Sequence, residues 1–185
     1  MTTQWYVNLA QTPLVDNKKF AIYEMDKAEL FTCAGHTDIS IREWRPVVNK
    51  TKRKSLTTKK GFHNTAIARK TVPAPIQWFV NRYNPRKTHW DILYHGCGKD
   101  DIGTEALVDY GFIEDHRKSS TTVCRYDPYH PDPEVRKFPT ETFDEIFSIY
   151  VLNVVPQNEG RKILREIYSL LKPKGTAIIA VRRDI

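Results

Sequence analysis

The second half of the chain alternates between short apolar runs and amphipathic stretches. Four runs are rich in aliphatic, aromatic and β-branched residues and predict strands: Ile92–Tyr94, Thr121–Tyr126, Phe143–Leu152 and Thr176–Val181. The run at 143–152, FDEIFSIYVL, is nearly continuous, as expected for a strand that is buried on both faces. This strand therefore belongs to the interior of a sheet.

Helices are predicted between and before these strands. At 101–110 apolar residues recur every four positions, and Asp100 or Asp101 can cap the helix. The segment 159–172 has the clearest apolar stripe, with Asn158 as its expected cap and Pro173 as its expected end. A further helix is predicted at 73–83, beginning at a proline.

This alternation predicts an α/β fold: a Rossmann-like, mainly parallel sheet with helices on both faces. The first 45 residues hold three more strand-like pieces, at 4–9, 20–25 and 38–44. We expect a single domain over 1–185. It comprises N-terminal strands at 1–45 that complete the sheet edge, a basic loop or arm at 46–64 and a core at 65–185.

Composition adds limits on the class of protein. The 185 residues suit one domain, and no run approaches the roughly 20 apolar residues of a membrane helix. The N-terminus lacks a basic-then-apolar signal, so we expect a cytoplasmic protein with no membrane partner. The three cysteines share no metal-type spacing, which favours free thiols and no metal. The oligomeric state stays open.

The charge is strongly segregated along the chain. From Trp44 to Trp90 there is no acidic residue but there are twelve Lys and Arg, whereas the net charge of the whole chain is only +7. Such segregation favours a polyanionic partner, namely nucleic acid, and the alternative is a solvated basic linker. We expect Lys52, Arg53, Lys54 and Arg69 to contact this partner.

The candidate ligand-binding residues lie at the carboxyl ends of the predicted strands. In DILYHGCGKDDIGTEAL, at 91–107, a strand runs through Gly96, Cys97 and Gly98 into a helix, where the backbone can approach a ligand closely. Asp127 ends the next strand, where a carboxylate can accept hydrogen bonds from ribose hydroxyls. Asn153 follows the strand at 143–152, and Arg182 and Arg183 end the last one, where they could contact phosphate.

In order and spacing, the motifs GCGK, YDPY, FDEIFSIYVLNVVP and ILREIYSLLKPKGTAIIAV resemble those of class I methyltransferases. The resemblance covers 91–185 and implies S-adenosyl-L-methionine as cofactor. It implies that the glycine loop packs against the amino-acid part of the cofactor and that Asp127 holds its ribose. It places the remaining contacts at Tyr94, Pro128, Tyr129, Val151, Leu152 and Asn153.

A closer similarity is to small phage and bacterial methyltransferase-like proteins, including ones associated with DNA phosphorothioation. It rests on HNTAIAR at 63–69, PAP at 73–75, GCG at 96–98, DP at 127–128 and LNV at 152–154. The family's first strand usually carries an acidic residue where this chain has Tyr94, and a third glycine is common where Asp100 stands. Asp100 or Asp101 could replace that acidic residue.

The chain ends after AVRRDI, where the family fold continues with a helix and a hairpin, and the N-terminus resembles that missing end. We therefore expect a circular permutation that places the N-terminal strands beside 176–182, and the alternative is an unrelated hairpin.

The resulting hypothesis is an S-adenosylmethionine-dependent methyltransferase that acts on nucleic acid, with DNA favoured. His63 is the candidate base and Asn153 the candidate polar residue at the reaction site. The alternatives are a catalytically degraded protein that binds the cofactor or nucleic acid, and a small-molecule methyltransferase.

Overall fold

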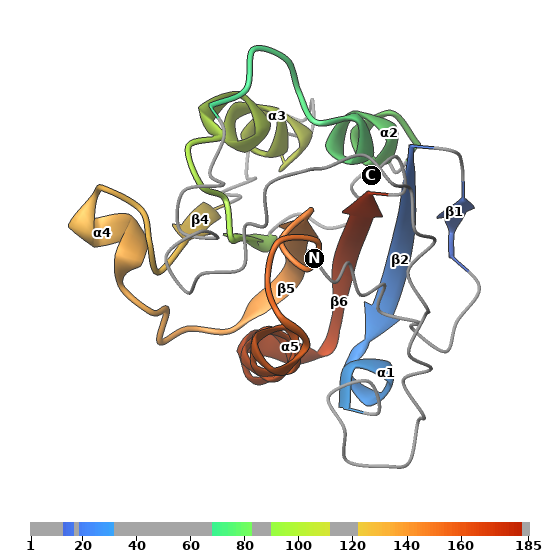
Figure 1. Cartoon of the computed structure of the whole chain (residues 1–185), viewed down its shortest axis with the longest axis vertical. Helices are drawn as coiled ribbons and strands as arrows, with labels where there is room; N and C mark the ends of the chain where they lie inside the picture. Colours follow the sequence, from blue (N-terminus) through green and yellow to red (C-terminus); the bar gives the residue numbers. More distant parts are fainter. Residues whose placement is uncertain (1–12, 17–18, 32–67, 83–89, 112–121, 183–185) are drawn as a thin grey trace, which may run out of the picture.

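The computed structural model describes residues 13–16, 19–31, 68–82, 90–111 and 122–182. Eleven elements follow one another in this part of the chain, as Figure 1 shows: β1 (Val15–Asp16), β2 (Phe20–Asp26), α1 (Lys27–Phe31), α2 (Ala74–Arg82), β3 (Asp91–His95), α3 (Asp101–Gly111), β4 (Thr122–Tyr126), α4 (Pro133–Arg136), β5 (Phe143–Ile149), α5 (Gln157–Leu170) and β6 (Leu171–Arg182).

The strands form one six-stranded sheet in the order β1-β2-β6-β5-β3-β4. Strands β6, β5, β3 and β4 are parallel, whereas β2 pairs antiparallel with β6 and β1 pairs antiparallel with β2. The predicted Rossmann-like α/β fold with a mainly parallel sheet is confirmed. Its parallel strands bring the ends of β3, β4, β5 and β6 to one edge of the sheet.

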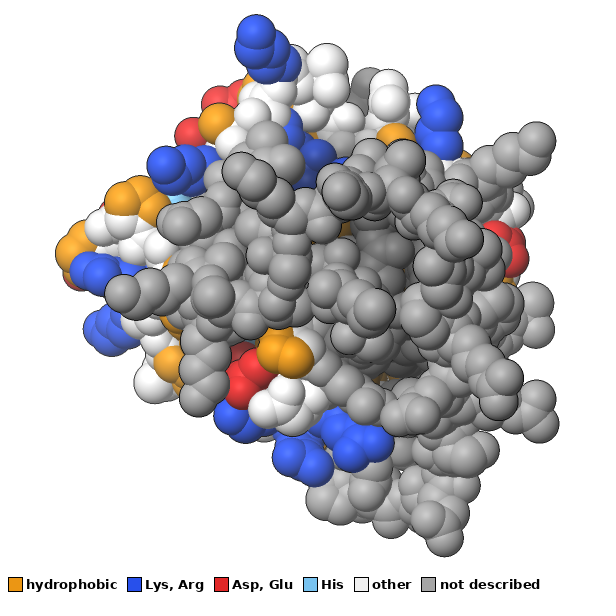
Figure 2. Space-filling model, viewed as in Figure 1, with side chains coloured by type: hydrophobic (Ala, Val, Ile, Leu, Met, Phe, Trp, Pro, Cys, Tyr) orange, Lys and Arg blue, Asp and Glu red, His pale blue; other side chains and the backbone are white. Residues whose placement is uncertain are grey.

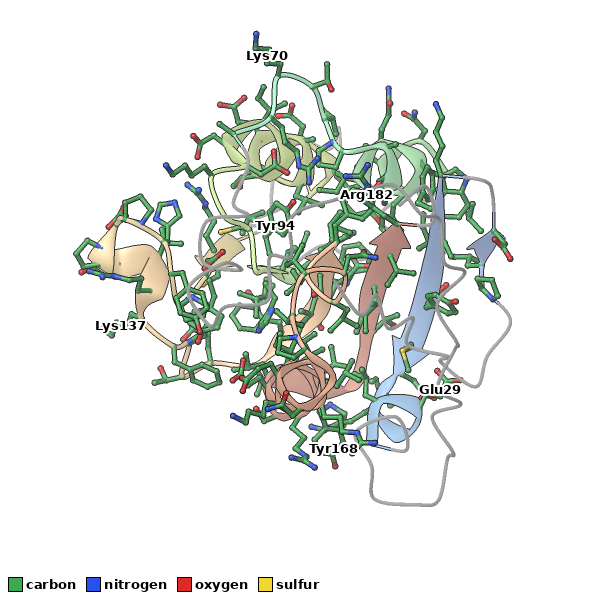
Figure 3. All side chains as sticks on the ribbon, in the orientation of Figure 1. Glu29, Lys70, Tyr94, Lys137, Tyr168 and Arg182 are labelled. Atoms are coloured by element: carbon green, nitrogen blue, oxygen red, sulfur yellow. The ribbon has the colours of Figure 1, made fainter. Side chains whose placement is uncertain are left out.

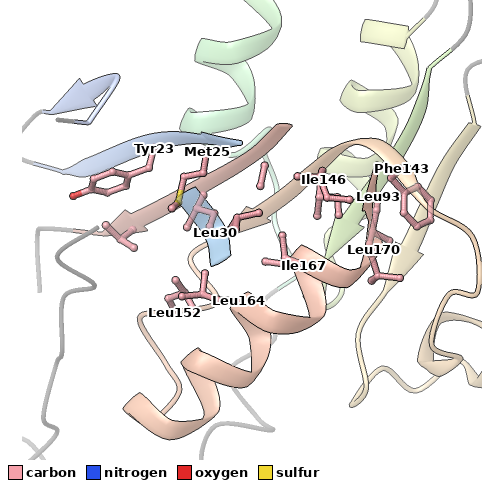
Figure 4. Packing of buried hydrophobic residues seen from close by; sticks show 14 of the residues in the cluster. Tyr23, Met25, Leu30, Leu93, Phe143, Ile146, Leu152, Leu164, Ile167 and Leu170 are labelled. Atoms are coloured by element: carbon pink, nitrogen blue, oxygen red, sulfur yellow. The ribbon is translucent and has the colours of Figure 1, made fainter. Parts of the chain in front are cut away.

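Alternation along the strands divides the core into two layers. In β6, Ala177, Ile179 and Val181 face one cluster, while Ile178 and Ala180 face the other. Helices α5 and α1 cover the first face, where Leu164 and Ile167 of α5 pack in the cluster drawn in Figure 4. Helices α2 and α3 cover the opposite face (Figure 1). Both faces are buried, which is why the sequence of β5 is mostly apolar.

The N-terminal strand β2 completes the sheet beside β6. Its register runs from Phe20 opposite Arg182 to Asp26 opposite Thr176. The expectation that residues of the first 27 lie beside the strand at 176–182 is therefore confirmed for β2. The strands expected at 4–9 and 38–44 and the basic arm at 46–64 lie outside the described residues.

Several predicted boundaries are wrong. Strand β5 ends at Ile149, not at 152, because Tyr150 takes a φ of 64° and starts a turn. Strand β6 begins at Leu171, which pairs with Phe143, so Pro173 lies inside a strand instead of ending the helix. The N-cap of α5 is Pro156, with no side-chain cap, whereas Asn158 was expected. Strand pairing accounts for the start of β6 at Leu171.

The part of the chain that the structure describes contains no helix with the length and apolar character needed to span a bilayer.

An ion-pair cluster fixes the start of β6. Lys172 Nζ lies 2.7 Å from Asp91 Oδ2 and 2.8 Å from Asp144 Oδ2, and these two hydrogen bonds raise the lysine pKa. We expect Lys172→Met to lower the free energy of unfolding by about 1–2 kcal/mol, because two partly buried carboxylates lose their common partner. Urea denaturation followed by tryptophan fluorescence measures this loss.

The raised lysine pKa also sets the pH range of this effect. The contribution of Lys172 is complete below about pH 10.5, the ordinary lysine value, and disappears as the pH rises through the raised pKa. Lys174→Met is the matched control, because Lys174 is exposed on the same strand. Equal stability of the two variants at neutral pH would contradict the prediction.

Candidate functional site

A cavity of about 260 Å³ opens at the carboxyl ends of the parallel strands. Its described lining comes from the loop after β3, the loop after β4, the turn after β5, the end of β6 and one side of α5. Ligands of open α/β sheets bind outside these strand ends. The volume lies just below the roughly 300–1,000 Å³ of ordinary small-molecule pockets.

The glycine loop, Gly96 to Gly98, lines this cavity. Gly96 and Gly98 have φ values of 66° and 54°, in the left-handed region that favours glycine. A Cβ on Gly96 would also overlap the side chain of Val151. The Gly96 N–H donates to the Tyr126 carbonyl at 2.7 Å, which fixes the loop against the end of β4. Glycine at 96 therefore leaves room for the Val151 side chain, which packs directly against the loop.

Asp127 lies directly beside this loop. Its Oδ2 accepts a hydrogen bond from the Gly98 N–H at 2.9 Å, and its Oδ1 accepts one from the Tyr129 N–H at 2.8 Å. Each carboxylate oxygen can accept a second hydrogen bond. The carboxylate is thus oriented by the backbone and can still accept hydrogen bonds from a pair of ligand hydroxyls.

Most of the predicted cofactor-binding residues meet in this cavity. The lining includes nine of them: Tyr94, Gly96, Cys97, Gly98, Asp127, Pro128, Tyr129, Val151 and Asn153. Arg69 and Arg182 also line it. Leu152 does not, because its side chain is buried in the core against α5. His63, Lys52, Arg53 and Lys54 lie outside the described residues.

Tyr94 takes the place of the family's acidic residue without supplying a negative charge. Burial and the neighbouring Asp100 carboxylate raise the pKa of Tyr94 well above its usual value, so the phenol stays neutral. Its hydroxyl donates to Asp100 Oδ2 at 2.7 Å. Neither candidate replacement lines the cavity: Asp100 is 2% exposed, and Asp101 pairs with Arg125 at 3.0 Å.

Asp100 instead caps the N-terminus of α3. Its Oδ1 accepts the Gly103 N–H at 3.0 Å, as a capping residue does, which confirms one of the two expected caps. A Cβ on Gly103 would overlap this carboxylate. Residue 103 is therefore a glycine because the cap needs the space.

Asn153 uses its side chain on the backbone of β6. Its Nδ2 donates to the Arg182 carbonyl at 3.2 Å, and its Oδ1 accepts the Arg182 N–H at 2.8 Å. This reciprocal pair ties the turn after β5 to the end of β6. The side chain lines the cavity, but its Nδ2 and Oδ1 atoms both form hydrogen bonds with Arg182.

Sequence reasoning missed the contribution of α5. Glu159, Lys162 and Glu166 line the cavity from one side of this helix, and Lys162 pairs with Glu159 at 2.9 Å. Glu166 Oε2 lies 3.4 Å from Nε2 of His95, which is buried at the end of β3. The i, i+3, i+7 spacing of three charged residues was the available signal.

Cys97 is positioned as a structural thiol. Burial raises its pKa to about 11, and Asp127 adds to the increase while Arg125 opposes it. The rise of two units from the ordinary value of 9.0 lowers the thiolate fraction about 100-fold. We expect iodoacetamide at pH 8 to alkylate Cys97 about 100-fold more slowly in the folded protein than in urea.

Peptide mass spectrometry at successive times gives the rate for each cysteine separately. The urea-unfolded protein is the control, in which all three cysteines should react alike. A folded Cys97 that reacts at the unfolded rate would show that the thiolate is accessible.

The fold is Rossmann-like, and its cavity lies at the carboxyl ends of the parallel strands. Residues 108–179 match the family model described as methyltransferase domain, a segment that begins within α3, ends within β6 and includes Asp127 and Asn153. This match supports a class I S-adenosylmethionine-dependent methyltransferase, and S-adenosylmethionine is the cofactor that the family typically uses. No curated protein and no solved structure matches the chain.

Proposed function

We propose that this protein is a methyltransferase that binds S-adenosylmethionine in the cavity at the ends of β3, β4 and β5. One observation carries the proposal: the Asp127 carboxylate lies 2.9 Å from the Gly98 amide, at the edge where a ribose and its substituents would be held. The family match over 108–179 supports the same activity.

The residues of the cavity fit this cofactor. Asp127 would accept hydrogen bonds from the two ribose hydroxyls, and the glycine loop would let the amino-acid part lie against the backbone. Pro128 and the half-exposed Tyr129 would pack near the adenine. When bound, the cofactor supplies a methyl group on a positively charged sulfur, and much of the rate comes from holding the acceptor in line with it.

We propose nucleic acid, with DNA favoured, as the methyl acceptor. The support is the acid-free stretch from Trp44 to Trp90 and the position of Arg69 at the cavity. In Figure 2 the visible Lys and Arg side chains of the described residues are spread around the outline of that face and form no single patch. The proposed contacts therefore depend on the stretch itself, with His63 as the proposed base.

Two finer predictions accompany this proposal. The first is a kinship with proteins associated with DNA phosphorothioation, for which the motifs at 63–69, 73–75, 96–98, 127–128 and 152–154 are the support. The second is the circular permutation. It is compatible with the antiparallel pairing of β2 and β6, because this pairing places an N-terminal strand beside the last strand of the described chain. Both stay predictions.

The test combines cofactor binding with methyl transfer. Calorimetry should show binding of S-adenosylmethionine and S-adenosylhomocysteine, and labelled methyl should then enter DNA when DNA, RNA and small-molecule pools are offered separately. If labelled methyl entered only small molecules, the acceptor would be a small molecule and not nucleic acid. Binding without label in any pool would favour the non-catalytic alternative, to which the neutral Tyr94 points. No binding at millimolar ligand would reject the proposal.

A further inference from the structure

One arginine of the cavity lies beside the glycine loop. Arg69 precedes α2 and lines the cavity together with Gly96 and Gly98. Its Nε lies 3.4 Å from Oδ2 of Asp100, and the Asp100 N–H donates to the Cys97 carbonyl at 3.1 Å. Asp100 therefore connects Arg69 to the loop that is proposed to receive the amino-acid part of the cofactor.

Both carboxylate oxygens of Asp100 already have partners within the protein. Oδ2 accepts a hydrogen bond from the Tyr94 hydroxyl at 2.7 Å and also contacts Arg69, while Oδ1 accepts the Gly103 N–H at 3.0 Å. Asp100 is 2% exposed and does not line the cavity. This carboxylate therefore orients Arg69 from behind and is not available to a ligand.

Arg69 keeps hydrogen-bond donors for a ligand. Its Nε edge faces Asp100, whereas the two terminal NH₂ groups of the guanidinium remain. The side chain is 30% exposed, so a molecule in the cavity can reach it. Its Cζ lies 5.4 Å from the centre of the Tyr150 ring, a contact that helps to fix the guanidinium plane. An arginine fixed in this way loses little freedom when it binds an anion.

The acidic residues of the described cavity lining lie elsewhere. Glu159 and Glu166 belong to α5, on the opposite face of the sheet from α2 and α3, and Asp127 follows β4, where it is proposed to hold the ribose. Tyr94, labelled in Figure 3, packs on the face of α2 and α3, and burial and Asp100 raise its pKa so that the phenol is neutral. The described lining beside Arg69 therefore offers a cation and no carboxylate.

We propose that Arg69 binds the carboxylate of the cofactor's amino-acid part, so that this end of the site selects its ligand by the carboxylate and not by the ammonium group. Guanidinium groups bind carboxylates through paired hydrogen bonds, whereas a ligand ammonium at the same place would lie beside a fixed cation. The proposal rests on the proposed function and deepens it. Contacts with nucleic acid then fall to the other basic residues of the acid-free stretch.

The first measurement compares ligands on the parent protein, so it does not depend on the folding of a variant. Calorimetry at constant ionic strength would titrate S-adenosylhomocysteine, its decarboxylated analogue and its deaminated analogue. We expect loss of the carboxylate to weaken binding about tenfold or more, because a hydrogen-bonded charge pair is lost, and loss of the ammonium to weaken it less than about threefold. An ammonium whose removal costs as much affinity as removal of the carboxylate would overturn the proposal.

The second measurement assigns the carboxylate to Arg69. Arg69→Gln should bind S-adenosylhomocysteine about tenfold more weakly than the parent, and the decarboxylated analogue no more weakly than the parent does. Arg69→Lys keeps a cation beside Asp100 and should lose several-fold, because the planar fork is missing. Lys70→Gln is the matched control, since it removes one positive charge at the next position, which is exposed and does not line the cavity. Equal affinity of Arg69→Gln and Lys70→Gln for S-adenosylhomocysteine would overturn the assignment.

Failure of the proposed function gives a different result. 5′-Methylthioadenosine keeps the adenine and the ribose but lacks the amino-acid part, so its binding should depend on Asp127 and not on Arg69. If neither this compound nor S-adenosylhomocysteine binds the parent protein, the proposed function is rejected and this inference with it. If both bind and Arg69→Gln changes neither affinity, only the inference is rejected.

Discussion

Replacement of Asp127 by alanine should weaken the binding of S-adenosylhomocysteine by at least about 100-fold. The carboxylate is proposed to accept two hydrogen bonds from the ribose, and a hydrogen bond to a charged group contributes about 1.5–3 kcal/mol. The loss of both therefore costs roughly 3 kcal/mol or more, and each 1.4 kcal/mol is a factor of ten in affinity. Titration calorimetry of parent and variant measures the change.

Two further variants separate cofactor binding from loop structure. Asp127 also accepts the amides of Gly98 and Tyr129, so alanine removes an anchor of the glycine loop. Asp127→Asn keeps one acceptor oxygen and should give an intermediate affinity. Asp109→Ala, at an exposed position on α3, should bind as the parent does. A folded Asp127→Ala protein with less than about threefold weaker binding would remove the ribose role.

Nucleic-acid binding should be steeply dependent on salt. Each Lys or Arg that neutralises a phosphate of duplex DNA contributes about −0.9 to the slope of log affinity against log salt. If half of the twelve basic residues between Trp44 and Trp90 make such contacts, the slope is roughly −5. A fourfold increase in salt then weakens binding by about three orders of magnitude. Fluorescence anisotropy with a labelled duplex, at several salt concentrations, measures the slope.

A charge-matched pair of variants locates these contacts. Replacing Lys50, Lys52, Arg53 and Lys54 together by alanine should flatten the slope by several units and leave the affinity for S-adenosylhomocysteine unchanged. The control removes four charges elsewhere, at the exposed Arg136, Lys137, Arg165 and Lys174. Equal slopes for the two quadruple variants would show that only net charge matters, and a parent protein without salt-sensitive binding would exclude nucleic acid.

The sequence by itself determined the architecture of the sheet and the positions of the glycine loop and Asp127 in the candidate site. Alternation in strands such as β6 encodes which side chains face each layer, because successive side chains of a strand point to opposite faces. The left-handed φ at Gly96 and Gly98 is a local property that glycine signals directly. Asp127 follows its strand at once, so its place beside the loop could be predicted from strand order alone.

Only the tertiary structure decided what the other site residues do. The Tyr94 hydroxyl donates a hydrogen bond to Asp100. The Asn153 side-chain amide forms two hydrogen bonds with the backbone of Arg182, 29 positions away. The meeting of Arg69 with Tyr150 likewise joins segments that are far apart in the chain. Hydrophobic periodicity and turn residues predict the local structure of a few neighbouring residues. The contacts described above depend instead on how β5, β6 and the segment before α2 pack together. Their geometry therefore arises only when the sheet and its helices are assembled.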